Sequence, residues 1–550
     1  MKFLKVLVNA VLCGLFFSVL LALLTFDINI NLPFDPIALG ALALTLAIPY
    51  GLITVLSVTV LFFVVQFFYG RKFRIKAVSP SFLAAAAALL ILVFLVVFLE
   101  NVRYFRSFFD PGTSKALRIQ TIILGAMAAL ATAALYVSRR LKSRILPLAA
   151  YFILFASGLI MVIGQRAAFP LSLRGAKEGR LEARKADKNI ILIGLEGLSF
   201  DFILPLISEG KLPNFSWLVD NGSWGRLKTF SPTESYILDT SLKTGKLPAK
   251  HRRISLGSYG PFFGTGRLEV TPRFILFRQM IRLGLLETGA NNPPPGVRDI
   301  QGIIEANGMK AVSTPAPSGA DLPEGDAKSD RAFNAAFKID PGVTNRFVTA
   351  ARSAFASDFN REESAFAEKA RSQPRLFHLR LDGLNTVEAF FYKYSFPEQF
   401  GNIAQDDINR YGQVIARYYE YYDQLIGKYL AALKDNEILV VYSPYGMDPL
   451  PTWKRIVEWA LGSSEISADH EDAPDGGVFF YGSEIQKRNS VEGMTLVDIA
   501  PTLLYYLGLP VGRDMDGIVQ SPVFVRDFTA ENPIFSISSY EEFEIGKTGH

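Results

Sequence analysis

The sequence predicts a bundle of five membrane-spanning α-helices followed by an α/β domain with a mostly parallel central sheet. Mean hydropathy over the 550 residues is +0.23, whereas a soluble protein of this length normally averages below zero. Five apolar stretches lie within residues 1–166. After them, short β-branched runs alternate with helical stretches, which is typical of a parallel sheet covered by helices.

Each apolar stretch is near or above the roughly 18–20 residues that cross a hydrocarbon core. The first is too long for a signal peptide and lacks a small-residue cleavage site, so we interpret it as a retained helix. The second contains Pro49, which indicates a kink in one long span. The predicted spans are Leu4–Phe26, Ile37–Phe68, Phe82–Leu99, Ile119–Val137 and Ile145–Ile163.

Loop charges predict the orientation of the bundle. Ten basic residues precede the first span or follow the second and fourth, against four in the opposite loops. This bias places the N-terminus in the cytoplasm. Five crossings then put everything after Arg166 outside, so we expect a multi-pass protein of the bacterial inner (cytoplasmic) membrane with a periplasmic or extracellular C-terminal domain.

Charge and composition exclude several classes of function. Residues 1–166 carry a net charge of +11 and the remainder −6, which argues against a nucleic-acid partner. The expected partners are the lipid bilayer and an envelope protein, glycan or lipid. The spans hold almost no ionisable residues, which disfavours a transporter. Cys13 as the single cysteine excludes a disulfide framework, and four histidines exclude a His-rich metal site.

The chain is predicted to divide into a membrane domain (1–166), a polar linker (167–188) and an outer domain (189–550) with an insertion at about 252–372. Chemistry in open α/β sheets gathers at the carboxyl ends of strands. There the sequence places Glu196, Ser235, Asp382, Asn385 and the loop 443–447. Strands are expected at Asn189–Gly194, Lys310–Ser313, Arg375–Leu381, Glu437–Tyr442 and Gly477–Tyr481, and helices at Phe200–Glu209, Ala404–Lys434 and Thr495–Leu507.

Several motifs of the outer domain, taken in order, resemble the alkaline phosphatase superfamily, most closely its bacterial type I phosphodiesterase/nucleotide pyrophosphatase branch. The resemblance implies two divalent cations, usually zinc, held by Asp and His around a Thr or Ser nucleophile. The five-span architecture is also similar to phosphoethanolamine transferases and lipoteichoic acid synthases. The motifs are Gly194–Asp201, Gly210–Leu218, Pro232–Ser235, Thr240–His251, Met494–Leu503 and Asp514–Gly517.

Carried over position by position, the resemblance implies a degenerate metal site. Glu196 stands at the first metal-ligand position, Ser235 at the nucleophile and His470 at the last ligand. Since zinc catalysis ordinarily needs three protein ligands, we expect no cofactor, with zinc or another divalent metal only if the site works. The other four ligand positions hold Asn385, Ala389, Pro444 and Tyr445.

The leading hypothesis is therefore a membrane-anchored pseudoenzyme that serves as a non-catalytic binding or scaffold component of the envelope. The alternative is a phosphodiesterase or phospho-group transferase acting on envelope lipid or glycan with Ser235 as nucleophile. Simpler interpretations stay open: Ser235 as a turn hydroxyl, Glu196 as a helix cap, His470 as a surface histidine and His251 as part of a solvated basic turn. The tyrosines of 404–434 favour core packing.

Overall fold

The computed structural model describes residues 2–69, 80–140, 145–169, 187–261, 266–273, 277–291, 297–314, 326–401, 403–460, 462–472 and 474–541. The chain forms two compact units. Unit 1 comprises Met1–Arg174 and Pro248–Pro295, and unit 2 comprises Gly175–Leu247 and Gly296–His550. Most of the predicted linker, residues 170–186, lies outside the described residues.

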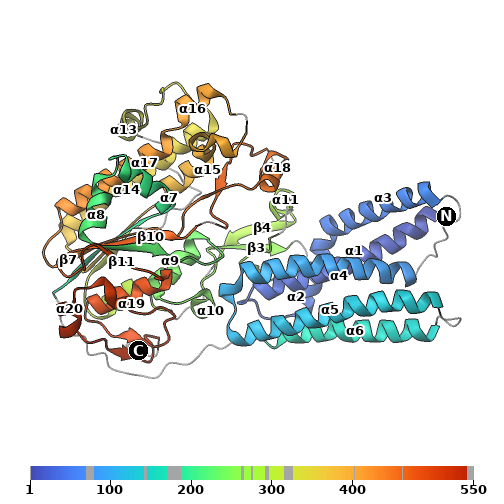
Figure 1. The fold of residues 1–550 in the computed structure, drawn as a ribbon. Coiled ribbons are helices and arrows are strands. Elements are labelled where there is room, and N and C mark those ends of the chain that lie inside the picture. Colours follow the sequence, from blue (N-terminus) through green and yellow to red (C-terminus); the bar gives the residue numbers. More distant parts are fainter. Residues whose placement is uncertain are drawn as a thin grey trace. The chain divides into compact units, whose positions relative to one another are not determined.

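Unit 1 is a helical bundle in which α1 packs against α4, α4 against α5, and α5 against α6 (Figure 1). Four segments of the described chain are long and apolar enough to cross a membrane: Phe3–Ile28, Pro36–Phe68, Ala85–Tyr104 and Pro111–Ala134. The predicted fifth span lies in α6, where the described apolar part, Phe152–Ala167, is shorter. The helices are α1 (Lys2–Ile28), α2 (Pro36–Leu46), α3 (Leu52–Tyr69), α4 (Pro80–Tyr104), η3 (Arg106–Phe108), α5 (Pro111–Arg140) and α6 (Ile145–Ala167).

The second predicted span is one continuous helical segment, Pro36–Phe68, as expected, and its winding changes at Pro49. Ala47–Gly51 (η1) form one π-helical turn between α2 and α3. Proline has no N–H to donate and its ring crowds the preceding turn, so a wider turn relieves both constraints. A Cβ on Gly14 would lie 2.9 Å from the Cα of Gly51, so glycine lets α1 approach this turn closely.

The segment 248–295 belongs to the same unit as the bundle. Asn29, which follows α1, accepts hydrogen bonds on Oδ1 from the backbone N of Glu269 (2.7 Å) and Val270 (3.0 Å). Asn101 in α4 accepts one from the backbone N of Arg273 at 2.8 Å. The start of the predicted insertion is thus held by the ends of two spans. Its elements are α10 (Pro248–His251), β3 (Gly257–Pro261), α11 (Phe277–Arg282) and β4 (Leu286–Ala290).

Unit 2 is built on a seven-stranded sheet of order β11-β2-β10-β7-β1-β6-β5. β1 pairs in parallel with β6 and β7, and β5 with β6, whereas β10 runs antiparallel to β7 and β2. The mostly parallel sheet expected from the sequence is confirmed. Its strands are β1 (Asn189–Leu195), β2 (Ser223–Leu227), β5 (Ala311–Ser313), β6 (Leu376–Leu381), β7 (Glu437–Tyr442), β10 (Gly476–Tyr481) and β11 (Asn489–Ser490).

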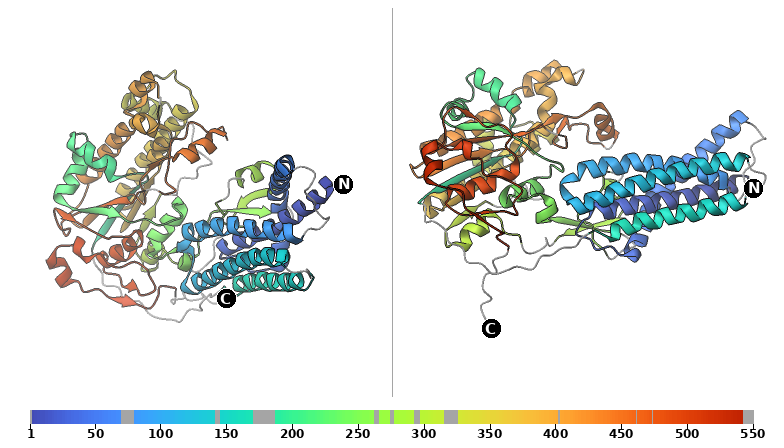
Figure 2. Two further views of the ribbon diagram at one scale, coloured as in Figure 1. Left: turned by 45° about the vertical axis from the view of Figure 1, so that its right-hand side comes forward. Right: turned by 60° about the horizontal axis from the view of Figure 1, so that its bottom comes forward.

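Helices cover both faces of this sheet, because alternate residues of the buried strands point to opposite sides (Figure 2). One face packs against α7 (Phe200–Ser208), α8 (Pro213–Asn221), α13 (Ala327–Phe337), α14 (Arg346–Ser372), α15 (Gly383–Ser395) and α17 (Val414–Ala431). The other packs against α9 (Ser235–Thr244), α12 (Ile300–Ala306), α19 (Ile499–Tyr506) and α20 (Arg526–Glu531).

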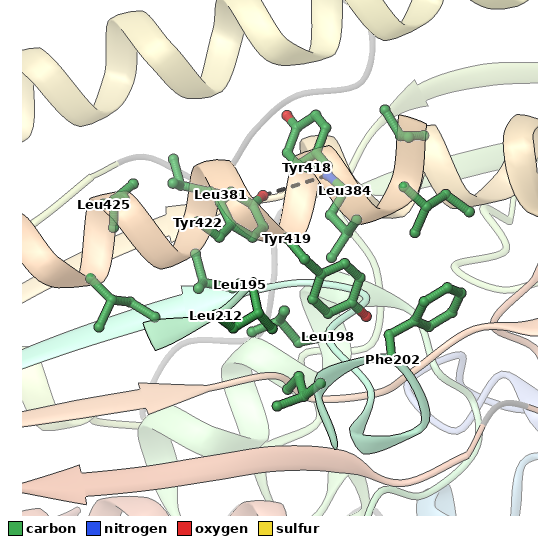
Figure 3. Close-up of a cluster of buried hydrophobic side chains, with 14 of the residues drawn as sticks. Leu195, Leu198, Phe202, Leu212, Leu381, Leu384, Tyr418, Tyr419, Tyr422 and Leu425 are labelled. Carbon is green, nitrogen blue, oxygen red and sulfur yellow. Dashed lines mark hydrogen bonds between the residues drawn. The ribbon is translucent and has the colours of Figure 1, made fainter. Parts of the chain in front are cut away.

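The tyrosines of α17 lie in the core, as predicted. Tyr418, Tyr419, Tyr422 and Tyr429 are fully buried, and Figure 3 shows the first three among leucines that include Leu195 of β1 and Leu381 of β6. The prediction of one helix over 404–434 is wrong, since α16 (Gln405–Tyr411) ends before α17 begins. At the break, a Cβ on Gly412 would lie 2.7 Å from the carbonyl oxygen of Ile408.

Within unit 2, residues 448–469 form a short excursion from the sheet between β7 and β10. Its two ends pair as the antiparallel strands β8 (Asp448–Pro449) and β9 (Ala468–Asp469), and α18 (Thr452–Ala460) lies between them. The remaining small elements of unit 2 are η4 (Pro397–Gln399), η5 (Leu496–Asp498), β12 (Val511–Gly512), η6 (Ser521–Val523) and β13 (Ser536–Ile537).

Candidate active site

A buried row of three residues crosses the middle of the sheet. In the strand register Arg380 of β6 lies beside Gly194 of β1, and Gly194 lies beside Tyr442 of β7. A Cβ on Gly194 would lie only 2.6 Å from the Tyr442 hydroxyl, so glycine makes room between the two larger side chains. Arg380 is 3% exposed, which is rare for an arginine unless it is paired.

Helix α9 lies over this row and supplies three polar side chains from one face. Ser235, Asp239 and Lys243 are spaced four residues apart, so they line up along the helix. Lys243 pairs with Asp239 at 2.8 Å. Ser235 is the first residue of the helix and is partly exposed, and the side chain of Asp239 is 11% exposed.

The guanidinium of Arg380 joins the strand row to the helix. Its Nη2 donates to Ser235 Oγ at 2.5 Å and also contacts Glu196 Oε1. Its Nη1 lies 3.1 Å from Asp239 Oδ2 in an ion pair. One planar cation thus bridges two buried carboxylates and a hydroxyl, a geometry suited to the fixed fork of arginine.

Both oxygens of Glu196 are engaged. Oε1 accepts a hydrogen bond from Ser235 Oγ at 2.6 Å, and Oε2 accepts one from the Tyr445 hydroxyl at 2.7 Å. The ring of His470 stacks on Tyr445 with centroids 4.6 Å apart, and the backbone carbonyl of His470 accepts from the Thr233 hydroxyl at 2.6 Å. Glu196 does not cap α7, because Ser199 takes that role by accepting from the backbone N of Asp201.

The charges of this cluster support one another. Burial opposes ionisation of Asp239, but Arg380 and Lys243 outweigh it and lower the pKa of that carboxyl. Burial also opposes the charge of Arg380, yet Asp239 and Glu196 raise its pKa. Burial and the neighbouring Glu196 raise the pKa of Tyr445 well above its usual value. The phenol therefore keeps its proton and donates a hydrogen bond to Glu196.

A small cavity of about 10 Å³ lies against the cluster, lined by Glu196, Ser235, Asp239, Arg380 and Tyr442 among others. That volume accommodates about one water molecule. Behind the cavity, the Nε2 of His378 lies 2.9 Å from the Tyr442 hydroxyl. Burial, then Lys243, lowers the pKa of His378 well below its usual value, so its ring is neutral.

The structure brings some of the sequence-predicted site residues together and separates others. Glu196, Ser235 and Tyr445 are joined by hydrogen bonds, and Pro444 lines the cavity. His470 reaches the group through its stacking on Tyr445. On α15, Asn385 and Ala389 contribute no ligand to the cluster, and Ala389 packs against the core.

Of two neighbouring acids, Glu388 is bonded away from the cluster, whereas Asp382 lies close enough to Glu196 for its charge to act on it. Glu388 is fully buried and accepts from the Tyr419 hydroxyl at 3.2 Å, and burial raises its pKa well above the usual range. Burial, then the charge of Glu196, raises the pKa of Asp382 to about 6. The prediction of His251 as a solvated residue is wrong, since it is buried and its Nδ1 accepts from the backbone N of Arg253.

These residues do not fit the two-metal centre that the family resemblance implies. In the described part of the chain, no group of three or more His, Cys, Asp or Glu could hold a metal ion. Both oxygens of Glu196 already have partners, and the positive charge beside Ser235 comes from Arg380. A cation placed there would meet the guanidinium, with strong repulsion in a low-dielectric site.

Sequence reasoning missed Arg380, Asp239 and Lys243. A signal was present: His378 and Arg380 alternate with leucines in a strand that is otherwise apolar on both faces. A cation inside such a strand must have a buried counter-charge. The four-residue spacing of Ser235, Asp239 and Lys243 was a second signal, because it places an acidic side chain on the same helix face as the serine.

Unit 2 thus places a partly exposed serine at the start of α9 and a buried carboxylate just after β1, joined by a hydrogen bond. The family model for type I phosphodiesterase/nucleotide pyrophosphatase matches residues 190–471, and the chain belongs to this family. A solved structure of phosphonate monoester hydrolase SpPMH from Silicibacter pomeroyi is similar at 13% identity and a TM-score of 0.38, covering 61% of this chain and 76% of that one. No curated protein sequence matches the chain.

Proposed function

We propose that this protein is a membrane-anchored, metal-independent member of its family whose outer domain binds a ligand without cleaving it. It would serve as a binding or scaffold component of the cell envelope. The observation that carries the proposal is Arg380, which meets Glu196, Ser235 and Asp239 where a catalytic member would need a divalent cation. Arg380 and Lys243 together balance the charges of Glu196 and Asp239, so the site has no need of a metal to be stable.

The proposal includes the membrane arrangement expected from the loop charges. Five spans would place the N-terminus in the cytoplasm and unit 2 in the periplasm or cell exterior of a bacterium. Four helices long and apolar enough to span support a membrane anchor, and α6 would be the fifth. The ligand would then be an envelope protein, glycan or lipid.

Metal content and hydrolysis test the proposal together. The purified full-length chain, dialysed against excess Zn²⁺ or Mn²⁺ and then against buffer, should retain far less than one metal per chain. It should not hydrolyse bis-(4-nitrophenyl) phosphate above the background of a Ser235→Ala variant. Stoichiometric metal together with turnover that Ser235→Ala abolishes would overturn the proposal.

A second candidate function is favoured by the exposure and bonding of Ser235. Its hydroxyl is partly exposed and donates to Glu196 at 2.6 Å while accepting from Arg380 at 2.5 Å. A carboxylate in this position can accept the proton of an attacking hydroxyl, and a guanidinium can stabilise the charge that develops. In this phospho-group transfer without a metal, the Ser235 oxygen would form a bond to phosphorus as the P–O bond to the donor's alcohol breaks. The alcohol would leave with the proton that Glu196 took from Ser235, and an acceptor hydroxyl would later displace the serine oxygen from phosphorus.

Trapping the phosphoserine distinguishes the two candidates. The full-length chain would be incubated with ³²P-labelled envelope phospholipid, quenched in acid and digested, and the peptide carrying Ser235 analysed for label. The second candidate predicts label that both Ser235→Ala and Glu196→Gln remove. Absence of label in the wild-type protein with each envelope phospholipid class would eliminate it and leave the binding function.

A further inference from the structure

Helix α18 is amphipathic in the unusual sense, with its large apolar side chains exposed and its charged side chains bound to the protein. A surface helix normally buries its apolar face and exposes its charges. In α18 the exposed large side chains are Trp453 (57%), Ile456 (61%) and Trp459 (72%). They are three residues apart and so share one face of the helix. We call these three residues the Trp–Ile–Trp strip.

The charged residues of α18 are turned toward the protein instead. Lys454 Nζ lies 2.7 Å from Asp469 Oδ2 and also pairs with Glu471. The guanidinium of Arg455 lies over the ring of Phe400, 4.7 Å from its centroid, and Nη1 donates to the carbonyl of Gln399 at 3.2 Å. The helix is therefore held on unit 2 by its polar side, with the Trp–Ile–Trp strip facing outward.

We propose that the Trp–Ile–Trp strip docks unit 2 onto the surface of the membrane that holds the spans of unit 1. Tryptophan and isoleucine without an outward charge match the boundary between headgroups and acyl chains, where tryptophan is enriched. A strip of this kind facing water would be unfavourable in a soluble monomer. A bilayer surface would be available to the strip, because unit 1 of the same chain carries helices long and apolar enough to cross a bilayer.

Chain connectivity strengthens the choice of a bilayer over a separate protein. The chain passes between the two units at Arg174–Gly175, Leu247–Pro248 and Pro295–Gly296, which tethers unit 2 to the membrane at three points. Tethering raises the effective concentration of lipid around the strip, so a few side chains suffice to dock. The excursion that carries the strip begins just after Tyr445 and ends just before His470. The rings of these two residues stack beside the candidate site.

The distribution of tryptophan makes the proposal testable by fluorescence. The sequence has four tryptophans, Trp217, Trp224, Trp453 and Trp459, and all lie in unit 2. The purified full-length chain would be reconstituted in vesicles of phosphatidylethanolamine and phosphatidylglycerol, with or without bromine near the headgroup end of the acyl chains. Bromine quenches tryptophan emission only at short range.

Brominated vesicles should lower the emission of the wild-type chain, and W453F/W459F should lose that quenching. The difference between these two proteins isolates the strip without altering Trp224, which packs on Phe200. The matched control is W217F, because Trp217 is 50% exposed on α8 but stands outside the strip, and this variant should keep the quenching. Equal emission of the wild type in both vesicles would overturn the proposal and assign the strip to a protein partner. Loss of quenching in W217F equal to that in W453F/W459F would also overturn it.

Discussion

The Nη2 atom of Arg380 lies 2.5 Å from the Oγ atom of Ser235. This contact places a permanent positive charge beside the hydroxyl that stands at the nucleophile position of the family. The same guanidinium pairs with Glu196 and Asp239, and Lys243 also pairs with Asp239, so two cations balance two carboxylates in the site. The consequences of that balance can be measured.

Replacing Arg380 should destabilise unit 2 strongly. Arg380→Met removes the guanidinium that pairs with the buried Glu196 and with Asp239, and breaking a buried pair in this way costs about 3–5 kcal/mol. Urea denaturation of the full-length chain in detergent, followed by tryptophan emission, reports unit 2 because all four tryptophans lie in it. Arg380→Lys should cost less, since it keeps the charge but loses the bridging fork.

The control for this substitution is an exposed arginine of the same unit. Arg226 pairs with Asp201 at 3.2 Å, with side chains 52% and 61% exposed. Such surface pairs contribute about 0–1 kcal/mol, so Arg226→Met should change the free energy of unfolding little. Equal losses in Arg380→Met and Arg226→Met would show that the Arg380 cluster is not what holds the site together.

Removing one hydroxyl from Tyr445 should also be costly. Tyr445→Phe deletes the 2.7 Å hydrogen bond to Glu196 Oε2 and leaves that oxygen buried without a donor. Hydrogen bonds to charged groups contribute about 1.5–3 kcal/mol, so a loss of that size is expected in the same denaturation experiment. Tyr429→Phe is the matched control, because its buried hydroxyl makes no hydrogen bond within the described residues. A near-neutral Tyr445→Phe would contradict the assignment of this bond.

Much of unit 2 could be predicted from sequence, because its core strands are short apolar runs and its chain order follows the family motifs. β1, β6, β7 and β10 lie where the pattern puts them, within one residue at each end. Strand β2 was missed, because Ser223–Leu227 contains a glycine and an arginine and becomes a strand through pairing with β10 and β11. The break at Gly412 depends on a backbone approach that helical periodicity does not record.

The candidate site was only half visible from the sequence. Motif comparison places Glu196, Ser235 and Tyr445 at the family's site positions, but it interprets Tyr445 only as the replacement of a lost metal ligand. In the fold, Tyr445 is a hydrogen-bond donor to Glu196. Arg380 has no counterpart among the family ligands carried over from the motifs, so motif comparison passes over it. Its role depends on strand register and on α9 lying above β6, which are tertiary facts.

In unit 1, Asn29 should control how firmly the segment 268–270 is held. Its Oδ1 accepts from the backbone N of Glu269 and Val270, and its Nδ2 donates to the carbonyl of Val270 at 2.9 Å. Asn29→Ala leaves those backbone groups without a partner, at about 1–3 kcal/mol. Hydrogen exchange at the Glu269 and Val270 amides of the full-length chain should accelerate by about tenfold or more, since 1.4 kcal/mol is a factor of ten.

A buried asparagine at the other end of the same helix provides the control for Asn29. Asn9 donates to the carbonyl of Lys5 at 2.6 Å, within α1. Asn9→Ala should leave exchange at Glu269 and Val270 unchanged. If both variants accelerate exchange equally, the effect comes from the bundle as a whole and the local role of Asn29 is wrong.

The stability of unit 2 should fall as pH rises from about 5 to 7, because of Asp358. This carboxyl is fully buried and its Oδ2 accepts from the hydroxyls of Tyr418 (2.9 Å) and Tyr422 (2.7 Å). Burial, then the charge of Asp382, raises its pKa to about 7 from an ordinary 3.8. Between these values the unfolded chain has released a proton that the folded chain keeps, so raising the pH favours unfolding by about 1.4 kcal/mol per pH unit.

Asp358→Asn should flatten this dependence, since the amide has no proton to release. Glu388 and Asp382, whose pKa values are also raised mainly by burial, act in the same direction, whereas His378, whose pKa is lowered by burial, acts in the opposite direction below about pH 6.5. The contribution of Asp358 is therefore the difference between the slopes of the wild type and of Asp358→Asn.

The matched control is Asp326→Asn. Hydrogen bonds from Ser329 lower the pKa of Asp326, so its contribution is lost only on acidification and the slope between pH 5 and 7 should not change. Urea midpoints measured by tryptophan emission across this range would decide. A wild-type slope in Asp358→Asn would mean that Asp358 is already ionised in the folded protein.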